Sequence, residues 1–233
     1  GLFRYDFFAS KYEADIAEGW AWSNDIRTLT IKLRQGHKWS DGEPFTSADM
    51  MFLWEQVFNH PELSPNGPEG FWKPKGEVAK WQAVDDYTVN ITFPIPYPIA
   101  MDRFGRTHFS GLGLLFLPAH YLKQFHKDFN PKADELAKAQ NLDDWKQLFN
   151  RHRDVGYQQT GVPLGRPLMD SWVPIERGNE RVLLQRNPYF HHVDPEGNQL
   201  PYIDRIVMDY VTSQELYTLK VASGEIDFAV RFL

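Results

Sequence analysis

Histidines are the side chains of this sequence whose types and spacing come nearest to a metal site. The tightest cluster reads His191-His192-x-Asp194, and His120 and His126 lie near each other on a stretch of helical character. A metal site needs ligands that converge in space and a second shell that orients them, and these spacings supply neither. We therefore expect a polar turn between strands at the first place, surface or packed histidines at the second, and no bound metal.

Paired carboxylates are the second feature that could do chemistry. They occur at Asp85-Asp86 and Asp143-Asp144. Adjacent strand residues point to opposite faces, so neither pair forms a catalytic dyad by itself. The first pair suits a hairpin turn and the second suits the start of a helix. The sequence also lacks the G-x-S-x-G, Walker, dinucleotide-binding and H-E-x-x-H motifs. Nothing here supports an enzyme, and no cofactor is implied.

The bulk composition is typical of a soluble globular protein. The 233 residues, 42% of them hydrophobic and 24% charged, suffice for one large domain or two small ones. The net charge of −6 argues against a nucleic-acid partner, because neutralising phosphates needs a basic surface. The absence of cysteine excludes disulfides and thiolate nucleophiles. No apolar run is long enough for a membrane span, and no signal peptide is visible.

Strands and helices that alternate along the chain must position these side chains. Residues 27–34 alternate polar and apolar side chains, with the period of a half-buried strand. Thr46 is the predicted N-cap of a helix over 47–58, with Asp49 at its third position. The other predicted elements are hairpins over 78–93 and 172–186, helical segments over 98–104, 132–140 and 143–151, a strand over 206–211, a helix over 213–223 and a strand over 226–230.

Two of these predictions carry finer detail. Asp143 is the predicted N-cap of the helix over 143–151. The strand, helix and strand over 206–230 predict a βαβ unit, whose connection length implies parallel strands and a right-handed crossover.

Four segments of the chain carry a family pattern. They are Gly1 to Asp6, Ala17 to Asp49, Val84 to Phe93 and Asn187 to Ala229. The second ends in D-G-E-P-F-T-S-A-D, which is similar to a pattern written D-G-x-P-F-T-A-x-D. In this order the segments resemble the extracellular solute-binding proteins of family 5, which include oligopeptide, dipeptide and nickel receptors.

The resemblance implies an α/β fold, of the periplasmic-binding-protein-like clamshell kind (type II). This chain would form lobe I with an extra mixed α+β subdomain, and the second lobe would be largely absent. Residues 1–10 plus 159–233 would form the sheet-centred core of lobe I, and residues 11–158 the extra subdomain.

The resemblance also implies a function. The protein would be the substrate-binding component of an ABC importer, which closes two lobes around a solute and delivers it to an inner-membrane permease. Oligopeptides are the expected solutes, with oligosaccharides as the alternative, and a hydrolase or an interaction module as less favoured classes. The expected partners are the small-molecule solute and the ABC permease, with no nucleic acid, and the protein would be a monomer. Its location would be periplasmic, or extracellular and lipid-anchored in a Gram-positive organism.

Candidate ligand-binding residues come from the same resemblance. Phe3 and Tyr5 would lie near the cleft, although core strand residues would look the same. Phe71 and Trp72 lie on an irregular loop, where Trp72 would face either cleft or core. Gly165 fits the glycine of a family segment G-T-G-P-Y that passes close to ligand. Pro167 takes the place of the tyrosine, so the usual peptide contact is in question here.

Overall fold

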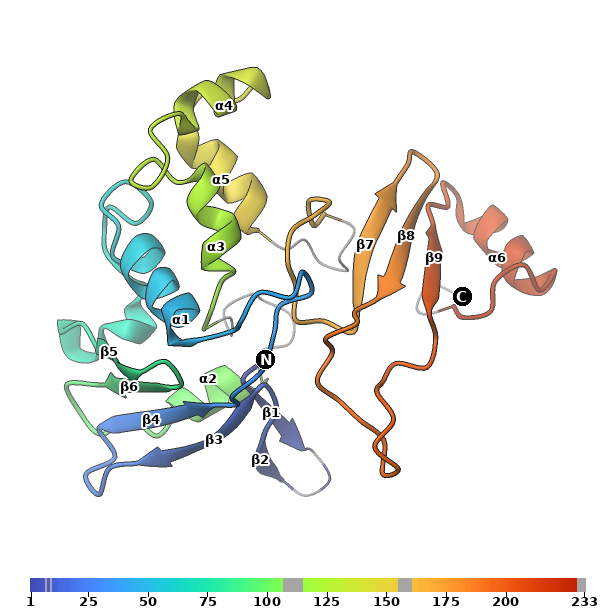
Figure 1. Ribbon diagram of the computed structural model, residues 1–233. Coiled ribbons are helices and arrows are strands. Elements are labelled where there is room, and N and C mark those ends of the chain that lie inside the picture. Colours follow the sequence, from blue (N-terminus) through green and yellow to red (C-terminus); the bar gives the residue numbers. More distant parts are fainter. Residues whose placement is uncertain (7, 9, 107–114, 155–160, 230–233) are drawn as a thin grey trace.

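Three antiparallel sheets organise the part of the chain that the structure describes. The computed structural model describes residues 1–6, 8, 10–106, 115–154 and 161–229. Figure 1 shows a four-stranded sheet and a group of helices on the left, and a three-stranded sheet with the last helix on the right. This is a mixed α/β architecture, as expected.

The four-stranded sheet contains the alternating strand predicted for residues 27–34. Its order is β3-β4-β6-β5, with β3 (Ala17–Trp22), β4 (Thr28–Leu33), β5 (Lys80–Asp85) and β6 (Thr88–Thr92). Leu29, Ile31 and Leu33 of β4 are buried, while the residues between them are exposed or half-buried. β5 and β6 pair antiparallel, which confirms the hairpin predicted over 78–93.

Helix α1 (Ser47–Leu53) begins where the sequence predicts and continues as a π-helical turn, η1 (Trp54–Phe58). The capping box is present. The Thr46 hydroxyl accepts a hydrogen bond from the backbone of Ala48 at 3.3 Å, and the Asp49 carboxylate accepts one from the backbone N–H of Thr46 at 3.1 Å. These bonds satisfy donors that a helix start leaves unpaired.

An aromatic core fills the space between this helix and the sheet. Two short 3₁₀ turns follow α1, η2 (Gly70–Trp72) and η3 (Pro74–Gly76). The indole rings of Trp54 and Trp81 stack with centroids 5.0 Å apart, and Trp72 lies parallel to Phe93 at 6.2 Å. Stacked and edge-on aromatic pairs bury large areas, so this cluster supplies much of the stability of the sheet.

A second, smaller core lies among the helices of the middle segment. These are α3 (Ala119–Leu122), η4 (Lys123–Phe125), α4 (Ala133–Ala139) and α5 (Trp145–Arg153). Their apolar side chains pack against Phe52, Leu53 and Val57 of the α1–η1 segment. Asp144, whose side chain accepts from the backbone of Gln147 at 3.0 Å, is the N-cap of α5, so the prediction of Asp143 is wrong by one residue.

The C-terminal part is a three-stranded sheet followed by a helix. Its order is β7-β8-β9, with β7 (Trp172–Arg177), β8 (Arg181–Arg186), β9 (Arg205–Asp209) and α6 (Gln214–Ala222). The predicted strand over 226–230 is not formed: residues 226–229 pair with nothing, and residue 230 lies outside the described part. β9 instead pairs antiparallel with β8. The predicted parallel βαβ unit is therefore not formed by the residues described, because residues 226–229 pair with no strand although the outer edge of β9 is open.

The N-terminal hairpin packs with the four-stranded sheet. It consists of β1 (Phe3–Asp6) and β2 (Lys11–Ala14), and β1 lies against α2 (Ala100–Arg106). Leu2 and Phe3 are buried in the same hydrophobic core as β4 and α1. The described residues of segment 1–10 thus pack with the four-stranded sheet, which lies in the segment predicted as the extra subdomain. The assignment of lobe and subdomain boundaries stays a prediction.

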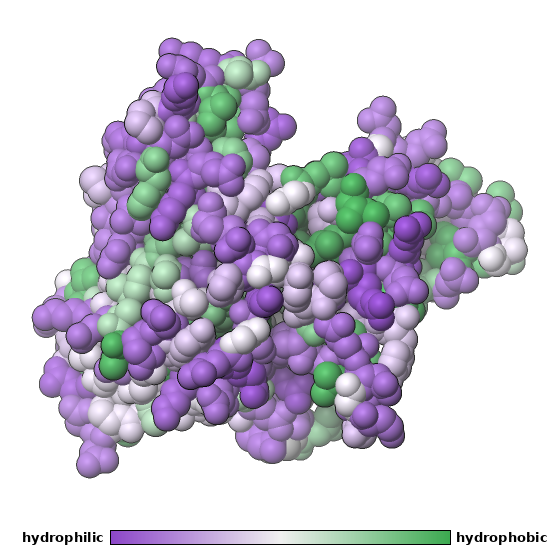
Figure 2. All heavy atoms as spheres, in the orientation of Figure 1, coloured by the Kyte–Doolittle hydropathy of each residue, from purple (hydrophilic) through white to green (hydrophobic). Residues whose placement is uncertain are grey.

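A few polar contacts join the two sheet regions. Ser40 donates its backbone N–H to the carbonyl of Leu168 at 3.0 Å, and its hydroxyl accepts from the backbone of Leu168 at 3.0 Å. Figure 2 shows apolar side chains gathered over the three-stranded sheet, where Ile175 and Val207 remain exposed. No helix among the described residues is both long and apolar enough to cross a membrane.

Candidate functional site

Asp49 is the most heavily hydrogen-bonded carboxylate of the family-like segment. It is 4% exposed. One oxygen accepts from Thr46 N–H and from the Trp39 indole at 3.2 Å, and the other accepts from the backbone of Ala119 at 3.0 Å. Burial raises the pKa of Asp49 above its ordinary value, against these three donors, which favour the charged form. Asp49 therefore fastens the Trp39 loop and residue 119 to the start of α1, and its role is structural.

Two of the predicted ligand contacts lie in the hydrophobic core. Phe3 is 2% exposed, and its ring meets Trp20 edge-on at 5.0 Å. Trp72 is 4% exposed among the rings described above. The sequence left open whether Trp72 faces the cleft or the core, and in the structure its side chain lies in the core. Contact of either ring with a solute stays a prediction.

Tyr5 and Phe71 are half-buried, and both lie near α2. The ring of Tyr5 is 5.1 Å from that of Tyr12, whose hydroxyl bonds to Asp102 of α2. The ring of Phe71 is 5.9 Å from that of Phe104, also on α2. These two aromatic side chains therefore retain surface near one helix. That placement fits the predicted contact with a solute without testing it.

Gly165 and Pro167 lie in the loop before β7. Gly165 is exposed and has a φ of +79°, with open space where a side chain would project. Pro167 is buried, next to the Ser40–Leu168 junction. None of the six predicted residues lines either of two hollows within the described ranges, one near the β5–β6 turn and one near η4.

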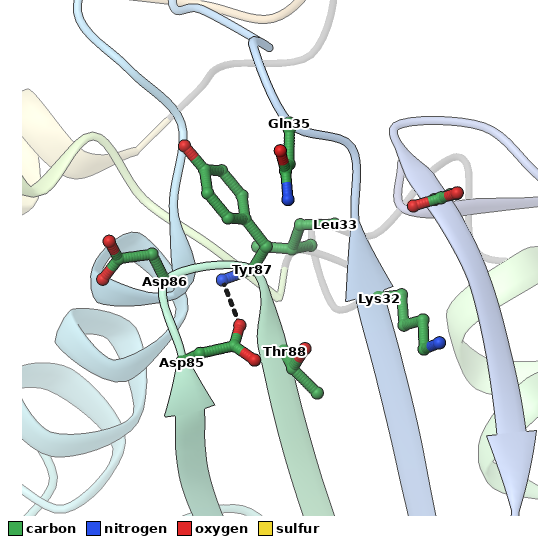
Figure 3. Close-up of a pocket in the computed structure, with 8 residues that line it drawn as sticks. Lys32, Leu33, Gln35, Asp85, Asp86, Tyr87 and Thr88 are labelled. Carbon is green, nitrogen blue, oxygen red and sulfur yellow. Dashed lines mark hydrogen bonds between the residues drawn. The ribbon is translucent and has the colours of Figure 1, made fainter.

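The hollow drawn in Figure 3 is polar and open. It measures about 460 Å³ and is lined by Glu18, Lys32, Leu33, Gln35, Asp85, Asp86, Tyr87 and Thr88. Asp85 accepts from the backbone of Tyr87 at 2.8 Å within the turn between β5 and β6. The carbonyls of this turn accept from Ser47: its hydroxyl bonds to Asp85 and its backbone N–H to Asp86, both at 2.8 Å. The interpretation of Asp85-Asp86 as a turn is confirmed, and the same turn holds the first residue of α1.

One group of side chains brings together residues from distant parts of the sequence. Asp15 Oδ1 lies 2.9 Å from His191 Nε2 and 2.7 Å from His192 Nε2. The ring of His37 lies 5.0 Å from that of His191, and the buried Nδ1 of His37 has no hydrogen-bond partner. Burial raises the pKa of Asp15, but hydrogen bonds from His191 and His192 outweigh it, so the net shift is downward. Burial, followed by the charge of His191, lowers the pKa of His37 to about 4.

A second group, His60, His126 and Asp128, is occupied by structural bonds. His60 Nδ1 accepts from the backbone of Glu62 at 3.2 Å, so its Nε2 donates to Asp128 at 3.2 Å. His126 Nδ1 accepts from the backbone of Asp128, and its Nε2 bonds to the carbonyl of Gln56 at 3.3 Å. Burial lowers the pKa of His126. With every ring nitrogen committed, this group holds the chain in place rather than a metal.

The histidine clusters seen in the sequence do not come together as single groups in the structure. Asp194 does not join His191 and His192. Its carboxylate accepts a hydrogen bond from the Tyr202 hydroxyl. It also accepts from the backbone and the side-chain nitrogen of Asn198, at 2.8 and 2.9 Å. These bonds lower the pKa of Asp194 to about 2, with the Tyr202 bond the largest cause. His120 pairs with Asp41 at 2.9 Å, apart from His126. Sequence reasoning missed Asp15, because no spacing relates residues 176 positions apart.

The architecture described above is that of a periplasmic binding protein. The family model for bacterial extracellular solute-binding proteins, family 5 (middle part), matches residues 11–233. The chain belongs to this family.

The relatives divide between two kinds of solute. The periplasmic alpha-galactoside-binding protein of Rhizobium meliloti (strain 1021) is 35% identical over 196 residues, covering 82% of this chain and 24% of the relative. A solved oligopeptide-binding protein OppA superposes with a TM-score of 0.82 at 34% identity, covering 97% of this chain and 34% of that one. The binding protein MelB from Agrobacterium fabrum, in complex with stachyose, gives a TM-score of 0.70 at 28% identity, covering 98% of this chain and 32% of that one. The chain thus spans between 24% and 34% of the length of these proteins.

Proposed function

We propose that this chain belongs to the substrate-binding component of an ABC importer, working in the periplasm with a membrane permease. The family match over residues 11–233 carries the proposal. One feature of the structure agrees with it: the aromatic side chains of Tyr5 and Phe71 remain partly exposed near α2. The mechanism would be closure of two lobes around a solute, without bond making.

Within that function, the solute we favour is an oligosaccharide of the alpha-galactoside class. The support is the 35% identity to the alpha-galactoside-binding relative over 82% of this chain, together with the likeness to a stachyose complex. An oligopeptide is the second candidate, since the oligopeptide-binding protein with a TM-score of 0.82 is nearly as similar in sequence.

The test is calorimetric titration of the full-length protein with stachyose and, separately, with a mixture of tri- and tetrapeptides. Mass spectrometry of material released from the freshly purified protein adds an independent readout. Saturable binding of stachyose without peptide binding supports the favoured solute. Peptide binding alone transfers the proposal to the second candidate. If neither solute binds and nothing is released, the transport function itself is contradicted.

The aromatic side chains beside α2 are the proposed contacts in this chain. Tyr5→Leu and Phe71→Leu should each weaken solute binding about tenfold, the equivalent of losing one aromatic stacking contact. Tyr121→Leu is the matched control, because Tyr121 is also a half-buried aromatic residue but bonds to His152 on α5, away from α2. Gly165→Ala tests the loop before β7 in the same titration. Unchanged affinity in all three site variants would remove these residues from the site.

A further inference from the structure

The group formed by Asp15, His191, His192 and His37 joins three segments of the chain. Asp15 lies in the turn between β2 and β3, His37 follows β4, and the two adjacent histidines lie in the long loop between β8 and β9. The carboxylate is 14% exposed at its side chain and His191 9%, whereas His192 is 39% exposed. The group therefore has a buried base and one side open to solvent.

The atoms that point toward one another are the atoms that bind transition-metal ions. Both Nε2 atoms face a single carboxylate oxygen, and all three ligand atoms lie within 4.8 Å of one another. A tetrahedral zinc ion with bonds of about 2.0–2.1 Å separates its ligand atoms by about 3.3 Å. The present separations of 2.9 and 2.7 Å would open by about half an ångström to admit the ion. A small rotation of exposed His192 would open its own separation, and a small shift of the Asp15 carboxylate would open the separation from His191.

His37 is the candidate for a fourth metal ligand. Its Nδ1 is buried without a hydrogen-bond partner, which is an unusual state for a polar atom. Its ring lies 5.0 Å from that of His191, but its nitrogens lie outside the set of ligand atoms within 4.8 Å of one another, so His37 would have to move toward the ion to become a fourth ligand. The group of His60, His126 and Asp128 differs, because backbone bonds occupy both nitrogens of His126 and Nδ1 of His60, while His60 Nε2 bonds to Asp128.

We propose that Asp15, His191 and His192 bind one divalent zinc ion, with His37 completing the coordination. In this arrangement the proton on each Nε2 moves to Nδ1 or to solvent, and the metal takes its place between nitrogen and carboxylate. The ion would tie the β8–β9 loop to the four-stranded sheet region, between segments 176 positions apart. It would be a structural ion, distinct from the transported solute.

The experiment uses the full-length protein, stripped with EDTA and dialysed, with Zn²⁺ alone as the probe. Calorimetry and elemental analysis should give one zinc per chain, and zinc should raise the Tm. Co²⁺ should give the intense visible bands of a tetrahedral site. His192→Gln and Asp15→Asn should each weaken zinc binding at least tenfold. The exposed His192 is the safer variant, because its removal leaves the buried part of the group intact.

His120→Gln is the matched control. His120 is also a partly exposed histidine paired with one aspartate, Asp41, but it lacks a second histidine. Its zinc binding should equal that of the unmodified protein. The proposal is overturned if no zinc binds at micromolar concentration. It is equally overturned if His192→Gln and Asp15→Asn bind zinc as well as the unmodified protein does, since the ion would then lie elsewhere. The proposal is supported if the unmodified protein and His120→Gln bind zinc while His192→Gln and Asp15→Asn bind it at least tenfold more weakly.

Discussion

Asp49→Asn should destabilise the protein by about 2–4 kcal/mol. The carboxylate offers two acceptor oxygens to three donors: Thr46 N–H, the Trp39 indole and Ala119 N–H. Asparagine has the same shape but keeps only one acceptor and puts an NH₂ group in place of the other.

The magnitude follows from the best orientation that the amide can take. With its oxygen toward Thr46 and Trp39, the NH₂ group faces Ala119 N–H and leaves that donor unpaired, which costs about 1–3 kcal/mol. The two retained bonds change from charged to neutral, a loss of about 1 kcal/mol each. Because burial disfavours the charge that is removed, roughly 1 kcal/mol is regained.

Urea unfolding followed by tryptophan fluorescence measures this change, with the free energy of unfolding extrapolated to water. Asp86→Asn is the matched control, because it makes the same chemical change at an exposed carboxylate near the same helix, and should stay within about 0.5 kcal/mol. In the Trp39→Phe background, which lacks the indole donor, the effect of Asp49→Asn should shrink. If Asp49→Asn and Asp86→Asn cost the same, the reasoning about buried donors is refuted.

Three further predictions concern the core, a turn and pH. Trp72→Ala should destabilise the protein by about 3–5 kcal/mol in the same urea assay, and a cost below 1 kcal/mol would contradict its place in the aromatic core. Gly42→Ala should cost more than Gly36→Ala: both glycines have positive φ, but a Cβ at Gly42 would meet the Tyr189 hydroxyl at 3.1 Å, and equal costs would count against that contact. Burial, and then the charge of Arg151, lower the pKa of His152 to about 4, so unfolded chains bind the extra proton first and stability falls as pH drops from about 6.5 to 4. This loss of stability is about 1–2 kcal/mol after allowance for the partial exposure of the ring, and it should be absent from His152→Gln. If the variant and the unmodified protein lose stability equally between pH 6.5 and 4, His152 is not the cause.

Local patterns predicted local structure well. The alternation along residues 28–33 identified β4, and the spacing of Thr46 and Asp49 identified the capping box of α1, because both signals arise from neighbours in the sequence. The prediction of Asp143 as a cap failed by one residue, since Asp143 and Asp144 are chemically equivalent and only backbone geometry separates them.

Contacts between distant residues could not be predicted from spacing. The partner of His191 and His192 proved to be Asp15, while nearby Asp194 is engaged by its own turn. The strand expected over 226–230 has the right composition, but composition does not show whether a segment pairs with another strand, and residues 226–229 stay unpaired beside β9. The burial of Trp72 likewise depends on Trp81 of β5 and on Phe93, which directly follows β6.

The junction between the two sheet regions has a consequence for the order in which the chain folds during synthesis. The four-stranded sheet and most of its core come from residues 17–104, so they can form before the C-terminal sheet leaves the ribosome. The Ser40–Leu168 bonds and the contacts of Asp15 close loops of 128 to 177 residues and must come last. A nascent chain halted after residue 154 would therefore expose the docking edge around Ser40 to other proteins, including chaperones, until the rest of the chain arrives.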